Sequence, residues 1–311
     1  MHTVPRRLLL ALAAGGLAGC SDPGPSARVR LATGPRGGPY ATFGSRLATE
    51  AHRVHHGLTV RVLTTAASVE NLRMLGDGRA DTALTLADSA ADAAAGRGTF
   101  RRPAPIAALA RLYLNYLHLI VPADSTIEHP AQLAGRTVSL GAAESGTRAA
   151  AGRVLATAGV RDIRAVRLGL GESADALTRG SVDAFFWSGG APTWAISRLA
   201  RRHPLRLIPL GGFARALRAA HGPVYEEVSI PAGAYGTRKP TPTVGTPSYL
   251  VCRDRLADGT ARALTGVLFE RRDRLAVPDA PGSRLDERYA IGTGTVPLHP
   301  GAAAYYRAAY G

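Results

Sequence analysis

The chain has 311 residues and a formal net charge of +15, from 38 basic and 23 acidic side chains. Such a basic excess suggests a nucleic-acid partner, but the arginines are scattered through predicted helices and turns and no recognition motif accompanies them. We therefore expect no nucleic-acid partner. Because Lys239 is the only lysine, the composition indicates a bias toward arginine more than a phosphate-binding surface. A basic surface still favours anionic lipid headgroups and anionic ligands.

The N-terminus has the order of a secretion signal. Two arginines precede an apolar run from Leu8 to Leu17, and two small residues lead to Cys20. This ending resembles the bacterial lipobox, whose cysteine is acylated and becomes the first residue of the mature protein. We expect residues 1–20 to be the signal, and a lipid on Cys20 to anchor an extracytoplasmic protein to the cell membrane. The alternatives are an ordinary cleaved signal or a transmembrane anchor, but the apolar run is too short to cross a bilayer.

After the signal, the chain reads as a short tether followed by a two-lobed domain. Residues 21–27 are rich in Ser, Pro and Gly, as flexible linkers are. The rest exceeds the usual size of a single core, which favours two lobes. With Cys20 lipidated, only Cys252 remains, so we expect no internal disulfide and a fold that rests on its hydrophobic core. No later stretch is apolar and long enough to span a membrane.

Strand-like and helix-like segments alternate along the chain. Val29 to Thr33 reads as a strand, Tyr40 to His55 as a helix and Leu58 to Thr64 as a strand. This order predicts an α/β fold with parallel strands.

A repeated pattern supports two lobes. Leu-x-x-Gly-x-x-Asp occurs at residues 75–81 and 177–183, each time before a strand-like run. The glycines suit the C′ position of a helix, where φ is positive. A strand and glycine-rich turn at 29–38 similarly matches residues 137–146. We expect chain crossings at 112–122 and 228–235, with residues 28–114 and 232–311 in one lobe and 115–231 in the other.

Two glycine-containing loops are candidate ligand contacts. Thr33 to Tyr40 and Gly141 to Thr147 each lie between a predicted strand and a predicted helix. Backbone N–H groups at such helix starts can bind an anion, and ligands of open α/β sheets lie beyond the carboxyl ends of strands. A plain chain reversal or a helix cap is the alternative for each loop. Ser68 begins a third helix in the same way, and capping is as good an explanation there as ligand contact.

Other motifs are weaker. Gly169-Leu-Gly171 lacks the acidic partner of a dinucleotide site and is interpreted as a strand-to-helix turn. His52 and His56 share a helix face, but no neighbouring ligand completes a metal site, and His299 is assigned to a turn. No Gly-x-Ser-x-Gly elbow or His-Glu-x-x-His motif is present. We therefore expect a binding protein that is not an enzyme, with no cofactor and no bound metal.

Several segments, in order, resemble the TAXI group of solute-binding proteins that serve TRAP transporters. They are residues 33–40, 68–72, 78–88, 108–113, 132–141, 145–147, 182–186 and 297–306. The resemblance implies a type II periplasmic-binding fold with two lobes and a hinge, which captures an amino acid or dicarboxylate and delivers it to a TRAP-type permease. The ligand contacts that it implies are Gly37, Gly38, Tyr40, Ser68, Asp88, Ser145, Gly146, Thr147, Trp187 and Tyr235.

The chain departs from the family pattern around the expected pocket. Pro35 and Pro39 stand in the first loop, and Ala41 replaces a tyrosine. Residues 66–67 are alanines where paired glycines are usual, and residues 86–87 are Leu-Ala where Gln-Ser is usual. These changes predict a less polar pocket or a different solute.

The first interpretation is thus an extracytoplasmic receptor that captures a small anionic solute for uptake. An extracellular sensor of the same fold that takes no part in transport is the first alternative, and an exported enzyme on the same scaffold is the second. The identity of the solute, the coupling ion and the oligomeric state are not readable from the sequence.

Overall fold

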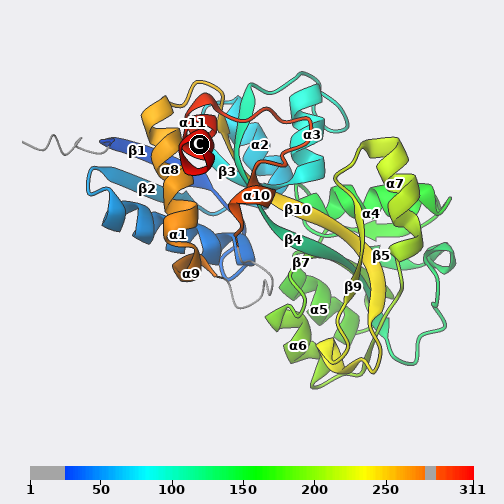
Figure 1. Cartoon of the computed structure of the whole chain (residues 1–311). Coiled ribbons are helices and arrows are strands. Elements are labelled where there is room, and N and C mark those ends of the chain that lie inside the picture. Colours follow the sequence, from blue (N-terminus) through cyan, green and yellow to red (C-terminus); the bar gives the residue numbers. More distant parts are fainter. Residues whose placement is uncertain (1–24, 277–284) are drawn as a thin grey trace, which may run out of the picture.

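The computed structural model describes residues 25–276 and 285–311 (Figure 1). The predicted signal, Cys20 and most of the tether lie outside the described residues. In the described part of the chain, no helix is both long enough and apolar enough to cross a membrane.

The helices and strands alternate as the sequence predicts. The first half of the chain forms β1 Ala27–Ala32, α1 Pro39–Val54, β2 Leu58–Leu63, α2 Ser68–Gly76, β3 Thr82–Leu86, α3 Ala87–Ala95, β4 Ile106–Pro122, β5 Thr137–Ser139 and α4 Gly146–Thr157. The next elements are β6 Arg164–Val166, α5 Leu170–Thr178, β7 Ala184–Gly189, α6 Trp194–Ala200, β8 Leu205–Leu207, α7 Ala214–His221 and β9 Glu226–Ile230. The last are β10 Thr241–Arg253, α8 Asp258–Glu270, α9 Arg272–Leu275, α10 Glu287–Ala290 and α11 Pro300–Tyr310.

The sheet has the strand order β2-β1-β3-β10-β4-β7-β5-β6, with β8 beside β4 and β9 beside β10. At one end β1, β2 and β3 are parallel and β10 runs antiparallel to β3. At the other end β5, β6 and β7 are parallel and β4 runs antiparallel to β7. Each end therefore repeats the same four-strand arrangement. We call the end around β1 the first half and the end around β5 the second half (Figure 1).

The repeated motif occupies equivalent places in the two halves. Gly78 follows α2 with φ of 70° and Gly180 follows α5 with φ of 68°, as predicted for helix C′ positions. A side chain at these positions would be strained, because only glycine adopts this backbone readily.

The aspartates of the motif also have equivalent partners. The Asp81 carboxylate accepts a hydrogen bond from the backbone N–H of Arg30 at 2.9 Å, and Asp81 N–H donates to the Arg30 carbonyl. Asp183 makes the same pair of contacts with Thr137, at 2.7 Å through its carboxylate. Each aspartate thus ties the start of the third parallel strand to the first parallel strand of its half.

Two long strands join the halves (Figure 1). β4 pairs with β10 in the first half and with β7 and β8 in the second, so the chain passes between the halves along a strand that includes residues 112–122. The second crossing lies in β10, which pairs with β3 through Ser248 to Cys252 and with β9 through Thr241 to Gly245. The predicted crossing at 228–235 is therefore wrong, because β9 turns back along β10 within the second half. Residues 232–240 belong to the second half, since Tyr235 packs with its core.

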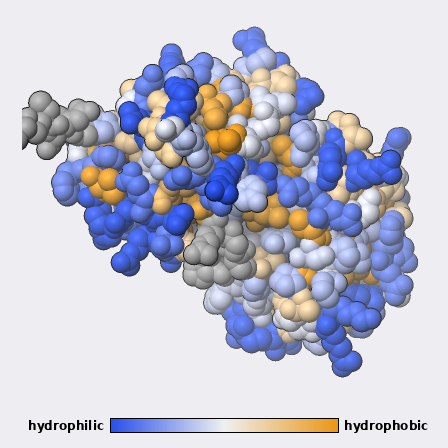
Figure 2. Space-filling model, viewed as in Figure 1, coloured by the Kyte–Doolittle hydropathy of each residue, from blue (hydrophilic) through white to orange (hydrophobic). Residues whose placement is uncertain are grey.

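Each half has its own packing around the sheet. In the first half, Phe43, Leu47 and Ala51 lie at four-residue spacing on α1 and are fully or almost fully buried against the sheet. All five residues of β3 are buried, because the strand lies inside the sheet, between β1 and β10, and the sheet is covered on both faces. Figure 2 shows hydrophobic residues gathered where the halves meet and hydrophilic residues over the outer ends.

Candidate functional site

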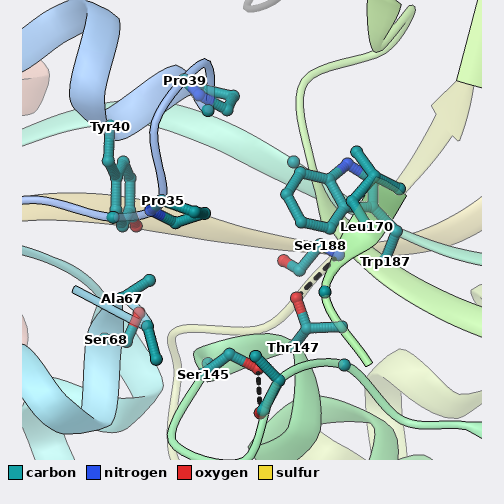
Figure 3. A pocket seen from close by; sticks show the side chains of 18 of the residues that line it. Pro35, Pro39, Tyr40, Ala67, Ser68, Ser145, Thr147, Leu170, Trp187 and Ser188 are labelled. Carbon is teal, nitrogen blue, oxygen red and sulfur yellow. Dashed lines mark hydrogen bonds between the residues drawn. The ribbon is translucent and has the colours of Figure 1, made fainter. Parts of the chain in front are cut away.

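A pocket lies between the two halves, at the carboxyl ends of the parallel strands (Figure 3). Its empty volume is about 680 Å³ when the opening to solvent is included. It is lined by Gly34, Pro35, Gly38, Pro39, Tyr40, Ala66, Ala67, Ser68, Leu86, Asn115, Gly141, Ala142, Ser145, Gly146, Thr147, Leu168, Gly169, Leu170, Phe186, Trp187, Ser188 and Gly189. Both halves therefore contribute to its walls.

The first loop supplies an apolar edge. Gly38 N–H donates to the Pro35 carbonyl at 3.0 Å, and Pro39 opens α1 at a position where a missing N–H is harmless. This turn places both proline rings on one side of the pocket, opposite Trp187 and Leu170 (Figure 3). These two prolines thus form an apolar part of the pocket wall.

The second loop opens α4 beneath the pocket. Ser145 is the N-cap, and its hydroxyl accepts the N–H of Arg148 at 3.2 Å. A Cβ on Gly146 would lie 2.6 Å from Leu86 Cδ1 and 2.7 Å from Ser68 Oγ, both in the first half. A side chain here would displace Leu86 or Ser68, so glycine favours the close approach of the two halves.

Trp187 and Thr147 belong to the wall that the second half contributes. The Trp187 indole N–H donates to Thr193 Oγ1 at 3.0 Å, and Thr147 Oγ1 accepts the Ser188 N–H at 3.2 Å. A Cβ on Gly189 would lie 2.5 Å from the indole nitrogen, so the ring needs this glycine beside it.

A few hydroxyl and amide groups face the pocket from the first half. The Tyr40 hydroxyl lies 2.9 Å from Ser248 Oγ, to which the Asn115 amide donates at 2.6 Å. Burial raises the pKa of Tyr40, so the phenol stays neutral and keeps its proton for hydrogen bonding. Ser68 Oγ accepts the Leu86 N–H at 3.1 Å.

None of the described residues that line the pocket has an ionisable acidic or basic side chain apart from the phenol of Tyr40. The walls are prolines, alanines, leucines and aromatic rings, with the hydroxyls as isolated polar points. This agrees with the expectation of a less polar pocket, and the arrangement suits an apolar or aromatic body with few hydrogen-bonding groups.

Seven of the ten predicted contacts line this pocket, namely Gly38, Tyr40, Ser68, Ser145, Gly146, Thr147 and Trp187. Gly37, Asp88 and Tyr235 do not. Gly37 is exposed at the turn of the first loop with φ of 76°. Its backbone conformation shapes the loop without bringing the residue to the pocket wall.

Asp88 lies away from the pocket wall, at a contact between the halves. Its carboxylate is 2.9 Å from the Arg153 guanidinium on α4 and accepts the Tyr225 hydroxyl at 2.8 Å. Arg153 also contacts Asp92. The predicted ligand contact is thus replaced by an ion pair between α3 and α4, because the α3 N-terminus faces the second half.

Tyr235 is buried in the second half. Its hydroxyl accepts the Thr193 N–H at 2.6 Å and lies 3.0 Å from His118 Nε2. The ring therefore lies behind the pocket wall, where sequence spacing alone could not place it.

Several lining residues escaped the sequence analysis, among them Leu168, Leu170, Phe186 and Ser188. A signal for the first two was present, since Gly169 lies between β6 and α5 and is the N-cap of α5, just as the two predicted loops open their helices. The position of the turn, at the carboxyl end of a parallel strand, was the usable clue.

Further contacts join the two halves beside the pocket. The Glu144 carbonyl accepts the N–H groups of Val69 at 3.1 Å and of Glu70 at 3.2 Å, at the start of α2. The Glu144 carboxylate also pairs with Arg73. The α2 N-terminus is therefore engaged by the other half of the protein.

Within residues 25–276 and 285–311, no cluster of three or more His, Cys, Asp and Glu side chains has the arrangement of a metal site. The pair His52 and His56 has ring centroids 5.9 Å apart, edge to face.

Two halves of repeated topology, two crossing strands and a pocket between them define a mixed α/β fold of the type II periplasmic-binding class. The chain belongs to the NMT1-like family, whose model matches residues 31–309. That match does not reach the TAXI assignment, which stays a prediction.

Solved structures support the fold. A Bordetella bronchiseptica RB50 protein is 19% identical, with 91% of this chain and 88% of that chain covered and a TM-score of 0.54. The binding component of a Pseudomonas aeruginosa ABC phosphonate transporter is 14% identical, covering 79% of this chain and 75% of that one, with a TM-score of 0.53. A Xanthomonas citri protein bound to chloride ion is 14% identical, covering 90% and 95%, with a TM-score of 0.51.

Proposed function

We propose that the protein is an extracytoplasmic solute-binding protein that encloses one small solute between its halves and delivers it to a membrane permease. The observation that carries this proposal is the shared pocket, whose walls come from helix starts and strand ends of both halves. A ligand that binds the closed form more tightly than the open form shifts the protein toward the closed form. A partner that recognises the closed form can therefore distinguish loaded from empty protein.

The solute that fits best has an apolar or aromatic body. Pro35 and Pro39 face Trp187 across the pocket, and the polar groups are few (Figure 3). Two carboxylates of a dicarboxylate would lose their hydration here without any cationic side chain among the described lining residues to meet them. We therefore propose, in place of the dicarboxylate or amino acid expected from the sequence, a solute with at most one compact anionic group. The N–H groups at the start of α4 are its natural partner.

The fold gives less direct support for a particular transport partner than the pocket gives for solute binding. An ABC-type permease is our proposal, supported by the Pseudomonas aeruginosa binding component of the same fold. The TRAP-type permease that the TAXI resemblance implies is the alternative. A gene for an ATP-hydrolysing subunit beside this gene supports the first, and TRAP permease genes in its place support the second.

A thermal-shift screen of protein lacking residues 1–20 tests the binding function. The panel contains aromatic and aliphatic monocarboxylates, sulfonates, neutral heterocycles, amino acids and dicarboxylates. A ligand at about 100 times its Kd stabilises the folded state by about 2.7 kcal/mol, so a saturable rise in Tm is expected for one class. Recovery of the unchanged solute by mass spectrometry excludes turnover. No shift across the panel, or a shift that Trp187→Ala leaves intact, contradicts the proposed site.

A further inference from the structure

Trp187 belongs to a closed cycle of hydrogen bonds, which it joins through its indole N–H and its backbone carbonyl. Its indole N–H donates to Thr193 Oγ1, whose own proton goes to the Gly190 carbonyl. Its backbone carbonyl lies 3.3 Å from His118 Nδ1, which also lies 2.9 Å from the Tyr116 carbonyl. Carbonyl oxygens only accept, so Nδ1 carries the proton of the imidazole.

The Tyr235 hydroxyl completes this cycle, because it contacts both His118 and Thr193. Since His118 Nδ1 carries the proton, Nε2 accepts, and the Tyr235 hydroxyl donates to it at 3.0 Å. The same oxygen accepts the Thr193 N–H at 2.6 Å. Burial lowers the pKa of His118 to about 4, so the imidazole is neutral near pH 7 and remains an acceptor. The Tyr235 hydroxyl thus connects β4 to the segment that carries the partner of the indole.

We propose that Tyr235 is a positioning residue, whose hydroxyl fixes the Thr193 segment and through it the orientation of the Trp187 ring as one wall of the pocket. This proposal rests on the proposed function, because it gives that wall a role in choosing the solute. Tyr235 itself does not line the pocket.

The geometry makes the ring orientation sensitive to this support. Gly189 lies directly against the indole nitrogen, so the ring is confined on that side. Across the pocket the prolines of the first loop face it (Figure 3). A ring released from Thr193 can turn into the pocket or out to solvent, and either movement changes the width of the slot for a flat or apolar solute.

The experiment uses the fluorescence of Trp187. The chain has two tryptophans, and Trp194 is exposed, so a Trp194→Phe background leaves Trp187 as the sole reporter. Tyr235→Phe removes one hydroxyl and keeps the ring. In this background we expect the acrylamide quenching constant of Trp187 to rise about twofold or more and its anisotropy to fall, because the ring gains motion on the nanosecond scale.

Tyr306→Phe is the matched control. The Tyr306 hydroxyl is also buried and donates to the Leu109 carbonyl at 2.9 Å, but it lies in the first half. The Tyr306→Phe substitution should lower the free energy of unfolding by about as much as Tyr235→Phe and leave the quenching of Trp187 unchanged. Thr193→Val should raise the quenching constant of Trp187 as Tyr235→Phe does. Thr193→Ser keeps the hydroxyl and should therefore give the same quenching constant as the parent protein.

These measurements need no ligand, so they are decided separately from the binding function. Equal quenching in the Tyr235→Phe and Tyr306→Phe proteins overturns the positioning role even if a solute is found. With a solute from the thermal-shift screen, Tyr235→Phe should weaken its affinity about tenfold, the size expected from one lost buried hydrogen bond. Unchanged affinity with altered quenching shows that the wall does not select the solute and also overturns the proposal.

Discussion

The Asp88 carboxylate and the Arg153 guanidinium lie 2.9 Å apart and come from opposite halves of the protein. The Asp88 side chain is fully buried and that of Arg153 is 12% exposed. A buried charge that loses its partner is strongly destabilising, whereas an exposed pair contributes little. This ion pair therefore contributes to holding the two halves together.

Arg153→Met should favour the open form, because opening lets Asp88 regain water. We expect a loss of about 3 kcal/mol from the unfolding free energy in urea, together with a larger radius of gyration in solution scattering. The control is Arg79→Met, since Arg79 and Asp77 form a pair in which both side chains are more than half exposed. That change should shift stability by less than about 1 kcal/mol. Equal losses of unfolding free energy in the two variants would show that the Asp88–Arg153 pair contributes no more to stability than an exposed ion pair.

Gly146→Ala should prevent full closure. Its new Cβ would meet Leu86 and Ser68 of the first half at less than 3 Å. We expect a solute found by thermal shift to bind at least about tenfold more weakly, since the closed state becomes strained. Gly152→Ala in the same helix has nothing within 4 Å of the new Cβ. It should leave binding unchanged and raise stability by up to about 1 kcal/mol through helix propensity.

Ala67→Gly should stabilise the protein. Ala67 has φ of 84° and ψ of −147°, a backbone conformation that glycine adopts readily and other residues adopt under strain. Relief of this strain should outweigh the extra freedom of glycine in the unfolded chain, for a net gain of about 1 kcal/mol in urea unfolding. Ala66→Gly is the control, because Ala66 has no positive φ and should lose about 0.5–1 kcal/mol. A loss at both positions would mean that the Ala67 methyl group contributes more through contacts than its backbone strain removes.

His118 should make stability depend on pH in mildly acidic solution. Burial lowers the pKa of His118 from 6.5 to about 4, so between these values the unfolded chain binds a proton that the folded protein does not. Its contribution is complete above about pH 6.5 and is lost as pH falls toward 4, by on the order of 3 kcal/mol.

Urea unfolding between pH 7.5 and 5 measures this dependence before most carboxylates titrate. His118→Gln should flatten the slope of unfolding free energy against pH, while replacement of the exposed His56 should not. An unchanged slope in His118→Gln would assign the pH dependence to other groups.

Ser145→Ala tests whether this residue serves the ligand or the helix. The hydroxyl is the N-cap of α4, so its removal should lower stability by about 1 kcal/mol even without solute. Trp187→Ala should weaken solute binding with a smaller effect on the empty protein, because the indole is partly exposed to the pocket. Differential scanning calorimetry of both variants without solute measures this contrast.

The sequence pattern was sufficient to predict those features that depend on residues close together along the chain. Glycine at the C′ positions of α2 and α5, the aspartates that follow, and the strand-to-helix loops at 33–40 and 141–147 all occupy their predicted places. Such features depend on backbone preferences and capping within a few residues, which a sequence displays directly. The α/β class and the parallel strands within each half follow from the same alternation of strands and helices.

The tertiary structure decided which of those places face the solute. Tyr235 and His118 are 117 residues apart, and Asp88 and Arg153 are 65 apart, yet each pair is in contact. The sequence by itself determined the elements, the repeat and the loops that open the helices, because these arise from short-range chemistry. Only the packing of the two halves decided that the second crossing runs through β10, that Asp88 pairs with Arg153 across the halves and that the described residues of the pocket wall carry no charged side chain, because those outcomes depend on contacts between distant segments.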